Sequence, residues 1–167
     1  ENPATVAIVV GPMQLYMVRH AHAGQRSHDG RDIYRPLSPE GHDRATELIQ
    51  LFGDKPIDRV LSSPATRCAQ TVAALAADRG MEVEECQALW EGSSIDEART
   101  ALEQLDGESV VACSHGDIIP SLIENVAGLG AEISGRGCEL GSIWVMEFDQ
   151  GNWQSARYVN SRDQVVI

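Results

Sequence analysis

Residues 17–24 read MVRHAHAG, an apolar segment that ends in an arginine and two histidines one residue apart. The segment Gln14–Val18, QLYMV, is short and largely apolar, which predicts a strand buried on both faces of a sheet. The polar side chains therefore follow the carboxyl end of a strand. A His-x-His pair there can hold a metal, because alternate side chains of an extended segment share a face. Arg-His can equally form a phosphate clamp with a nucleophile, so at this point both interpretations stay open.

Strand and helix patterns alternate along the rest of the chain. Ser38-Pro39 offers an N-cap and a first-turn proline for a helix that ends at Gly53. Further strands are predicted at 58–63 and 109–115, helices from about 65 to 79, after Ser94 and from about 118, and an antiparallel hairpin over 142–159. The alternation predicts an α/β fold, a three-layer αβα sandwich with a mainly parallel sheet and an antiparallel C-terminal hairpin.

Composition limits the classes of partner. With 13 Lys and Arg against 25 Asp and Glu, the chain carries a net charge of −12, which repels nucleic acids and anionic membranes. We expect neither as a partner. The four cysteines form no Cys-x-x-Cys pair and fall mostly in apolar patterns, as do reduced thiols of a cytoplasmic protein. The length of 167 residues predicts one domain over residues 13–167, with residues 1–12 a tag or N-terminal extension.

Four basic and histidine residues fall at predicted strand ends or helix starts: Arg19, His20, Arg67 and His115. Arg67 lies just inside a helix start, where free backbone N–H groups and the helix dipole favour an anion. The guanidinium groups of Arg19 and Arg67 can bind phosphate oxygens, while a neutral imidazole at His20 can attack phosphorus. This set predicts a pocket for phosphoryl transfer that requires no metal or cofactor.

Four linked motifs resemble those of the histidine phosphatase superfamily: RHA (19–21), RPLSPEG (35–41), VLSSPATRCAQT (60–71) and CSHGD (113–117). The likeness spans about Met13 to Val159, and the small, lid-poor branch typified by the SixA phosphohistidine phosphatases is the most similar. The resemblance implies that His20 is the phosphorylated nucleophile. It also implies that Arg19 and Arg67 hold the phosphate and that His115 stabilises the transferring group.

Glu91, Arg26 and Arg35 are further candidates, for a general acid and for substrate binding. Relatives that act on alcohol phosphates use a carboxylic acid to protonate the leaving oxygen, and Glu91 in LWEGSS lies in the corresponding region. Arg26 and Arg35 can bind or guide the anionic substrate, or they can pair with neighbouring acids such as Asp32. Asp117 is predicted to cap the helix that follows it.

The resulting hypothesis is a metal-independent phosphatase that forms phospho-His20 and acts on a phosphohistidine protein. Alternatives are a phosphomonoesterase for a small phosphorylated metabolite and a non-catalytic phosphate-binding module. The least favoured alternative is a metal-dependent hydrolase that uses His20 and His22, with His115 or Asp117 as further ligands. Two nearby arginines would crowd positive charge beside such a metal. His22 can also be a pocket-rim or an exposed loop residue.

Overall fold

The computed structural model describes residues 11–163, so the predicted N-terminal extension, residues 1–12, lies almost entirely outside the described residues. Its α-helices and strands are β1 (Met13–Arg19), α1 (Pro39–Phe52), β2 (Arg59–Ser62), α2 (Thr66–Asp78), β3 (Val83–Glu85), α3 (Ile95–Glu103), β4 (Ser109–Ser114), α4 (Ile118–Gly128), β5 (Glu132–Ser134), β6 (Ile143–Asp149) and β7 (Asn152–Val159). Two short 3-10 helices, η1 (Asp32–Tyr34) and η2 (Gln87–Leu89), complete the set. No helix within residues 11–163 has the length and apolar character needed to cross a membrane.

The strands form one seven-stranded sheet in the order β3-β2-β4-β1-β6-β7-β5. Four strands, from β3 to β1, run parallel, and β6 joins β1 and β7 in antiparallel pairs. The predicted α/β sandwich with a mainly parallel sheet and a C-terminal hairpin is therefore confirmed. The edge strands β3 and β5 were not predicted, because each has only three residues and no fully buried side chain to mark it.

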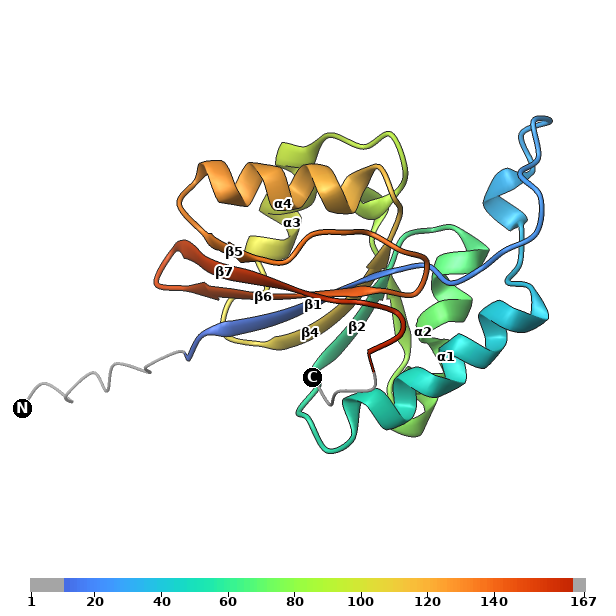
Figure 1. The fold of residues 1–167 in the computed structure, drawn as a ribbon, viewed down its shortest axis with the longest axis horizontal. Coiled ribbons are helices and arrows are strands. Elements are labelled where there is room, and N and C mark those ends of the chain that lie inside the picture. The colour runs from blue at the N-terminus through green and yellow to red at the C-terminus, as the bar shows by residue number, and fades with distance from the viewer. Residues whose placement is uncertain (1–10, 164–167) are drawn as a thin grey trace, which may run out of the picture.

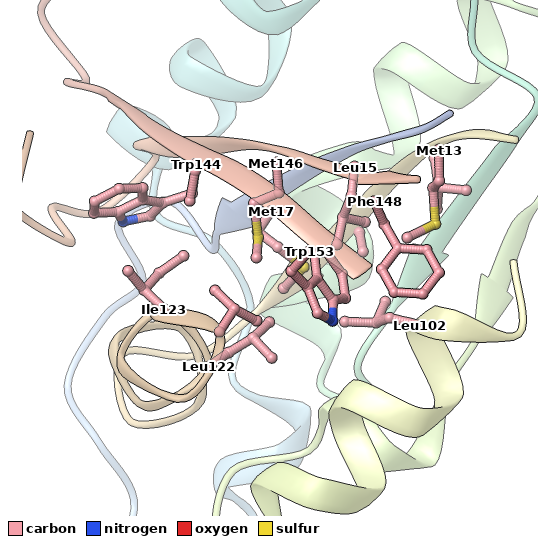
Figure 2. Packing of buried hydrophobic residues seen from close by; sticks show 14 of the residues in the cluster. Met13, Leu15, Met17, Leu102, Leu122, Ile123, Trp144, Met146, Phe148 and Trp153 are labelled. Carbon is pink, nitrogen blue, oxygen red and sulfur yellow. The ribbon is translucent and has the colours of Figure 1, made fainter. Parts of the chain in front are cut away.

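Helices cover both faces of the sheet (Figure 1), with α3 and α4 on one side and α1 and α2 on the other. Successive side chains of β1 point to opposite faces of the sheet, so this strand contributes to the hydrophobic core on each face. Leu15 and Met17 pack toward Leu122 of α4 (Figure 2). Tyr16 faces the other layer, where its ring lies 5.0 Å from that of Phe52 in α1. Because β1 is buried on both faces, its residues can be apolar throughout, and each buried Leu or Met contributes roughly 1.5–3 kcal/mol.

The helix starts follow the local sequence signals. Ser38 caps α1 by accepting from Gly41 N–H at 3.1 Å, with proline next in the first turn. Ser94 caps α3 by accepting from the N–H of Glu97 at 3.4 Å. These caps fix where the helices begin, and so they fix the loops that connect them to the carboxyl ends of the strands.

Candidate active site

A cavity of about 440 Å³ opens at the carboxyl ends of the parallel strands, where α/β sheets commonly bind ligands. It is lined by Arg19, His20, Arg26, Glu91, Gly92, His115, Gly116 and Asp117. The strand register brings the two histidines together. Arg19 of β1 is paired with Ser114 of β4, and His20 and His115 are the residues that directly follow them. The two imidazole rings lie 5.5 Å apart between centroids.

His20 is held as a neutral imidazole with one free ring nitrogen. Its Nδ1 lies 2.9 Å from the carbonyl oxygen of Ala21, which can only accept, so Nδ1 carries the proton and Nε2 keeps its lone pair. The pKa of His20 is lowered to about 4, chiefly by burial, with the charges of Arg67 and Arg19 adding to the effect and the Ala21 hydrogen bond opposing it. The ring is therefore uncharged at neutral pH and can act as a nucleophile.

His115 is fixed from both sides of its ring. Its Nε2 lies 2.8 Å from Ser63 Oγ, which β2 brings alongside β4, and 3.6 Å from Cys68 Sγ. Its Nδ1 lies 3.3 Å from an Arg67 nitrogen. Ser63 was not predicted as a site residue, although it belongs to the VLSSPATRCAQT motif. Trp90, which we did not predict in the site, packs its ring edge-on against His115 at 5.2 Å.

Arg67 is the second residue of α2 and is completely buried. Its guanidinium donates to the Asp32 carbonyl at 2.9 Å and lies 3.4 Å from the Asp32 carboxylate. Burial alone would raise the pKa of Asp32, but hydrogen bonds from Ser27 and Arg35 and the charges of Arg35 and Arg67 lower it overall. Within residues 11–163, Arg67 Nε has no hydrogen-bond partner although it is buried. A buried donor of this kind is costly unless a ligand pairs with it.

Arg19 ends β1 and reaches the loop before β6. Its Nη1 donates to the Cys138 carbonyl at 2.5 Å, and its buried Nε has no partner among the described residues. Gly116 makes room for this side chain, since a Cβ there would lie 2.8 Å from the guanidinium carbon of Arg19. The glycine of the SHG motif thus permits Arg19 to lie flat against the backbone that follows His115.

We call His20, Arg67 and His115 the floor of the site, and Arg26, Glu91 and Asp117 its rim. A carboxylate oxygen of Glu91 lies 2.9 Å from an Arg26 nitrogen, 3.4 Å from Arg67 and 3.9 Å from His115 Nδ1. The rim carboxylate therefore bridges the loop after β1 to the floor. A carboxyl group at this position on the cavity wall can exchange a proton with a group bound beside His115.

Three sequence-predicted residues are not part of the cavity lining. Arg67 is completely buried, and Arg35 and His22 lie elsewhere. Arg35 donates to Asp32 at 2.9 Å and to the Gly24 carbonyl at 2.7 Å, so it braces the loop that contacts Arg67. His22 is exposed and lies 2.7 Å from Ser38 Oγ, in a separate cavity from His20. Nowhere in residues 11–163 do three or more His, Cys, Asp or Glu side chains gather as a metal-ligand group.

The prediction that Asp117 caps α4 is wrong. The residue stands at the cap position, but its backbone is already helical (φ −92°, ψ −35°) and its side chain accepts no bond from the helix. Its carboxylate instead accepts the N–H of Gly92 at 2.7 Å. A capping side chain needs an extended backbone to reach the first-turn amides, and Asp117 lacks one.

The fold and the site together define a phosphatase class. The family model of the histidine phosphatase superfamily (branch 1) matches residues 15–98. The chain belongs to this superfamily, and it is a phosphatase.

Solved structures agree with this assignment. The protein histidine phosphatase SixA complexed with tungstate is similar at 25% identity and a TM-score of 0.67, over 89% of this chain and 95% of that one. A protein assigned as phosphohistidine phosphatase SixA from Nakamurella multipartitia is 28% identical with a TM-score of 0.65, over 90% and 95%. A phosphoserine phosphatase mutant from Entamoeba histolytica shares the fold at 17% identity and a TM-score of 0.66, over 90% and 98%.

Proposed function

We propose that this phosphatase transfers the phosphoryl group of its substrate to Nε2 of His20 and then hydrolyses phospho-His20. One observation carries the proposal: a buried, neutral imidazole with a free Nε2 sits among the donors Arg19, Arg67 and His115. Within residues 11–163 the buried Nε–H groups of both arginines have no partner, so each can donate a hydrogen bond to a phosphate oxygen.

In the first step, the Nε2 lone pair forms a bond to phosphorus, and the bond from phosphorus to the leaving atom breaks with its electron pair on that atom. The guanidinium groups of the two arginines stabilise the charge on the peripheral phosphoryl oxygens, with His115 beside them. In the second step, water attacks phosphorus and the P–N bond breaks. Its electron pair returns to Nε2, while the water loses a proton to a nearby base such as the Glu91 carboxylate. This scheme uses no metal.

We propose a protein-borne phosphohistidine as the substrate. Its imidazole, once protonated on the other ring nitrogen, leaves as a neutral group and needs little help from an acid. The likeness to SixA proteins at 25% and 28% identity supports this choice. The exposed rim does too, because the Arg26 side chain is 56% exposed and a protein surface can approach it.

A second candidate is a phosphomonoesterase for a small metabolite, and Glu91 favours it. An alkoxide leaves poorly without a proton, and the Glu91 carboxyl group lies 3.9 Å from His115 on the cavity wall, where it can protonate the leaving oxygen.

The first test is hydrolysis of p-nitrophenyl phosphate, with and without EDTA, by the wild-type protein and H20A. Activity that survives EDTA and disappears in H20A is expected. Rapid quenching should then trap an acid-labile, base-stable phosphoenzyme, as a phosphohistidine is. Loss of activity in EDTA would contradict the metal-independent scheme. Values of kcat/KM for a phosphohistidine protein and for alkyl phosphates then decide between the two substrates.

A further inference from the structure

Asp117 connects the segment after His115 to the turn that carries Glu91. Its carboxylate accepts the Gly92 N–H at 2.7 Å, although 25 residues separate the two. Within this turn the N–H of Ser93 donates to the Trp90 carbonyl at 3.1 Å, and Gly92 has φ +78°, a conformation that favours glycine. The turn therefore has a fixed shape, and the Asp117 bond fixes its position on the molecule.

The two ends of this turn are held differently. At one end the Trp90 ring packs against His115 at 5.2 Å, with the Arg67 guanidinium 5.9 Å from its centroid. At the other end, Gly92 is exposed, and its N–H is held by Asp117. Glu91 lies between these two anchors. Its remaining contacts are ion pairs, and one of them is to the exposed Arg26.

We propose that Asp117 is a positioning residue for Glu91. The bond from Gly92 to Asp117 holds the turn so that the Glu91 carboxyl group stays beside the breaking bond. The inference rests on the second candidate function, the phosphomonoesterase, in which Glu91 protonates the leaving oxygen. A misplacement of about 1 Å can reduce a rate by about 100-fold, so one hydrogen bond at the turn can matter for catalysis.

A purely electrostatic role for Asp117 makes a different prediction. Asp117 itself lines the cavity, where its negative charge repels an incoming phosphate. Asparagine removes the charge and keeps a carbonyl oxygen that can accept the Gly92 N–H. Alanine removes both. D117N and D117A therefore separate placement of the turn from charge at the rim.

The experiment compares two esters that differ in leaving group, p-nitrophenyl phosphate and phenyl phosphate. Phenolate is the poorer leaving group and depends more on proton donation. The quantity measured is the ratio of kcat/KM for phenyl phosphate to kcat/KM for p-nitrophenyl phosphate, because kcat/KM reports the transfer to His20 and not the hydrolysis of phospho-His20 that both esters share. It is determined for the wild-type protein, D117A, D117N, E91Q and the double variant D117A/E91Q.

We expect the ratio to fall about 100-fold in E91Q, as when a general acid is lost, and about tenfold in D117A. D117N should recover most of what D117A loses. The double variant should have the same ratio as E91Q alone. Once residue 91 can no longer donate a proton, its misplacement in D117A cannot lower the ratio further. Independently of turnover, the amide resonance of Gly92 should shift in D117A far more than in D117N.

D58A is the matched control. The Asp58 carboxylate also accepts a backbone N–H, that of Ser109 at 2.8 Å, but it does so at the amino ends of β2 and β4. Its removal should leave the ratio unchanged.

Three results would overturn the inference. A reduced ratio in E91Q with an unchanged one in D117A removes the positioning role alone. D117N as impaired as D117A means that charge is responsible. An unchanged ratio in E91Q removes the proposed role of Glu91, and the inference with it.

Discussion

The floor and the rim of the site differ in how their side chains are held. The floor residues His20, Arg67 and His115 are 7%, 0% and 2% exposed. The His20 side chain bonds to the carbonyl of the adjacent Ala21, whereas Arg67 and His115 bond to other segments of the chain. At the rim, the side chains of Arg26 and Glu91 are 56% and 24% exposed and pair chiefly with each other. Buried, hydrogen-bonded groups are preorganised for electrostatic stabilisation, whereas exposed ion pairs contribute little. This difference supports our proposal that the floor carries the phosphoryl chemistry and that the rim adjusts which substrates use it.

The largest expected effect is at the floor. H20A should lower kcat by at least about 10⁴-fold, because the covalent nucleophile is lost. Hydrolysis of p-nitrophenyl phosphate measures it, with circular dichroism to check the fold. H22A is the matched control, since His22 is exposed and lies outside the cavity. If H22A were as inactive as H20A, both histidines of the pair would be required and the nucleophile assignment would fail.

The second-largest loss of activity is expected for substitution of Arg67. R67A should lower kcat/KM by roughly 10²–10³-fold, as for loss of one preorganised donor to the transition state. R67K should not rescue it, because an ammonium cannot replace the planar fork that reaches Asp32 and His115 together. R79A, at the far end of α2, controls for loss of an arginine from the same helix. Wild-type-like kcat/KM in R67K would contradict the assigned geometry.

The pH profile tests the same floor. Because the pKa of His20 is lowered to about 4, kcat/KM should lose about tenfold per pH unit only below pH about 4. The free energy of unfolding depends on pH over a different range, because it reflects the difference in proton binding between the unfolded and the folded chain. The unfolded chain, with the ordinary His pKa of 6.5, binds the proton first, so stability should decline as pH falls from 6.5 toward 4. Thermal melting at both ends of this range should show a smaller decline in H20A than in the wild type.

Ser63 offers a milder change to the floor. S63A removes the 2.8 Å contact to His115 Nε2 and should lower kcat about fivefold, the equivalent of a hydrogen bond of ~1 kcal/mol. S62A is a close control, because Ser62 is also buried but its hydroxyl donates to the Ser63 carbonyl and not to His115. Equal losses in both variants would mean that repacking of β2, rather than the orientation of His115, limits the rate.

The smallest effect is expected at the rim. R26A should change kcat/KM for p-nitrophenyl phosphate by less than about threefold, since an exposed ion pair contributes ~0–1 kcal/mol. R31A is matched to it, because Arg31 lies in the same loop and pairs with Asp29 outside the cavity. A loss in R26A as large as that in R67A would erase the distinction between floor and rim.

Sequence patterns predicted the floor because its residues belong to local motifs at strand ends and a helix start. His20 and His115 each follow a recognisable apolar strand, and a parallel register then brings them together. The α/β architecture was predictable for the same reason, since long alternating segments carry a clear periodicity.

The rim was harder, because its contacts join segments that are distant in the sequence. The hydrogen bond from the Gly92 N–H to Asp117 cannot be predicted from local sequence, because the two residues are distant in the chain. An aspartate directly before a helix is instead expected to cap it. Asp32 was expected only to pair with loop arginines, which it does with Arg35. Its second pairing, with the buried Arg67, depends on how the loop folds back onto α2.

The position of β1 has a consequence for the order of folding. β1 lies in the middle of the sheet, yet both neighbours come from late in the chain: Gln14 is paired with Ser109 of β4 and with Glu147 of β6. The apolar first strand therefore remains unpaired until most of the chain has been synthesised, and contacts of such long sequence separation form slowly. Unpaired apolar strands are prone to aggregate, so we expect β1 to be the segment most exposed to this risk during the interval. Since His20 directly follows β1, recovery of catalysis after denaturation should report completion of the sheet rather than its beginning.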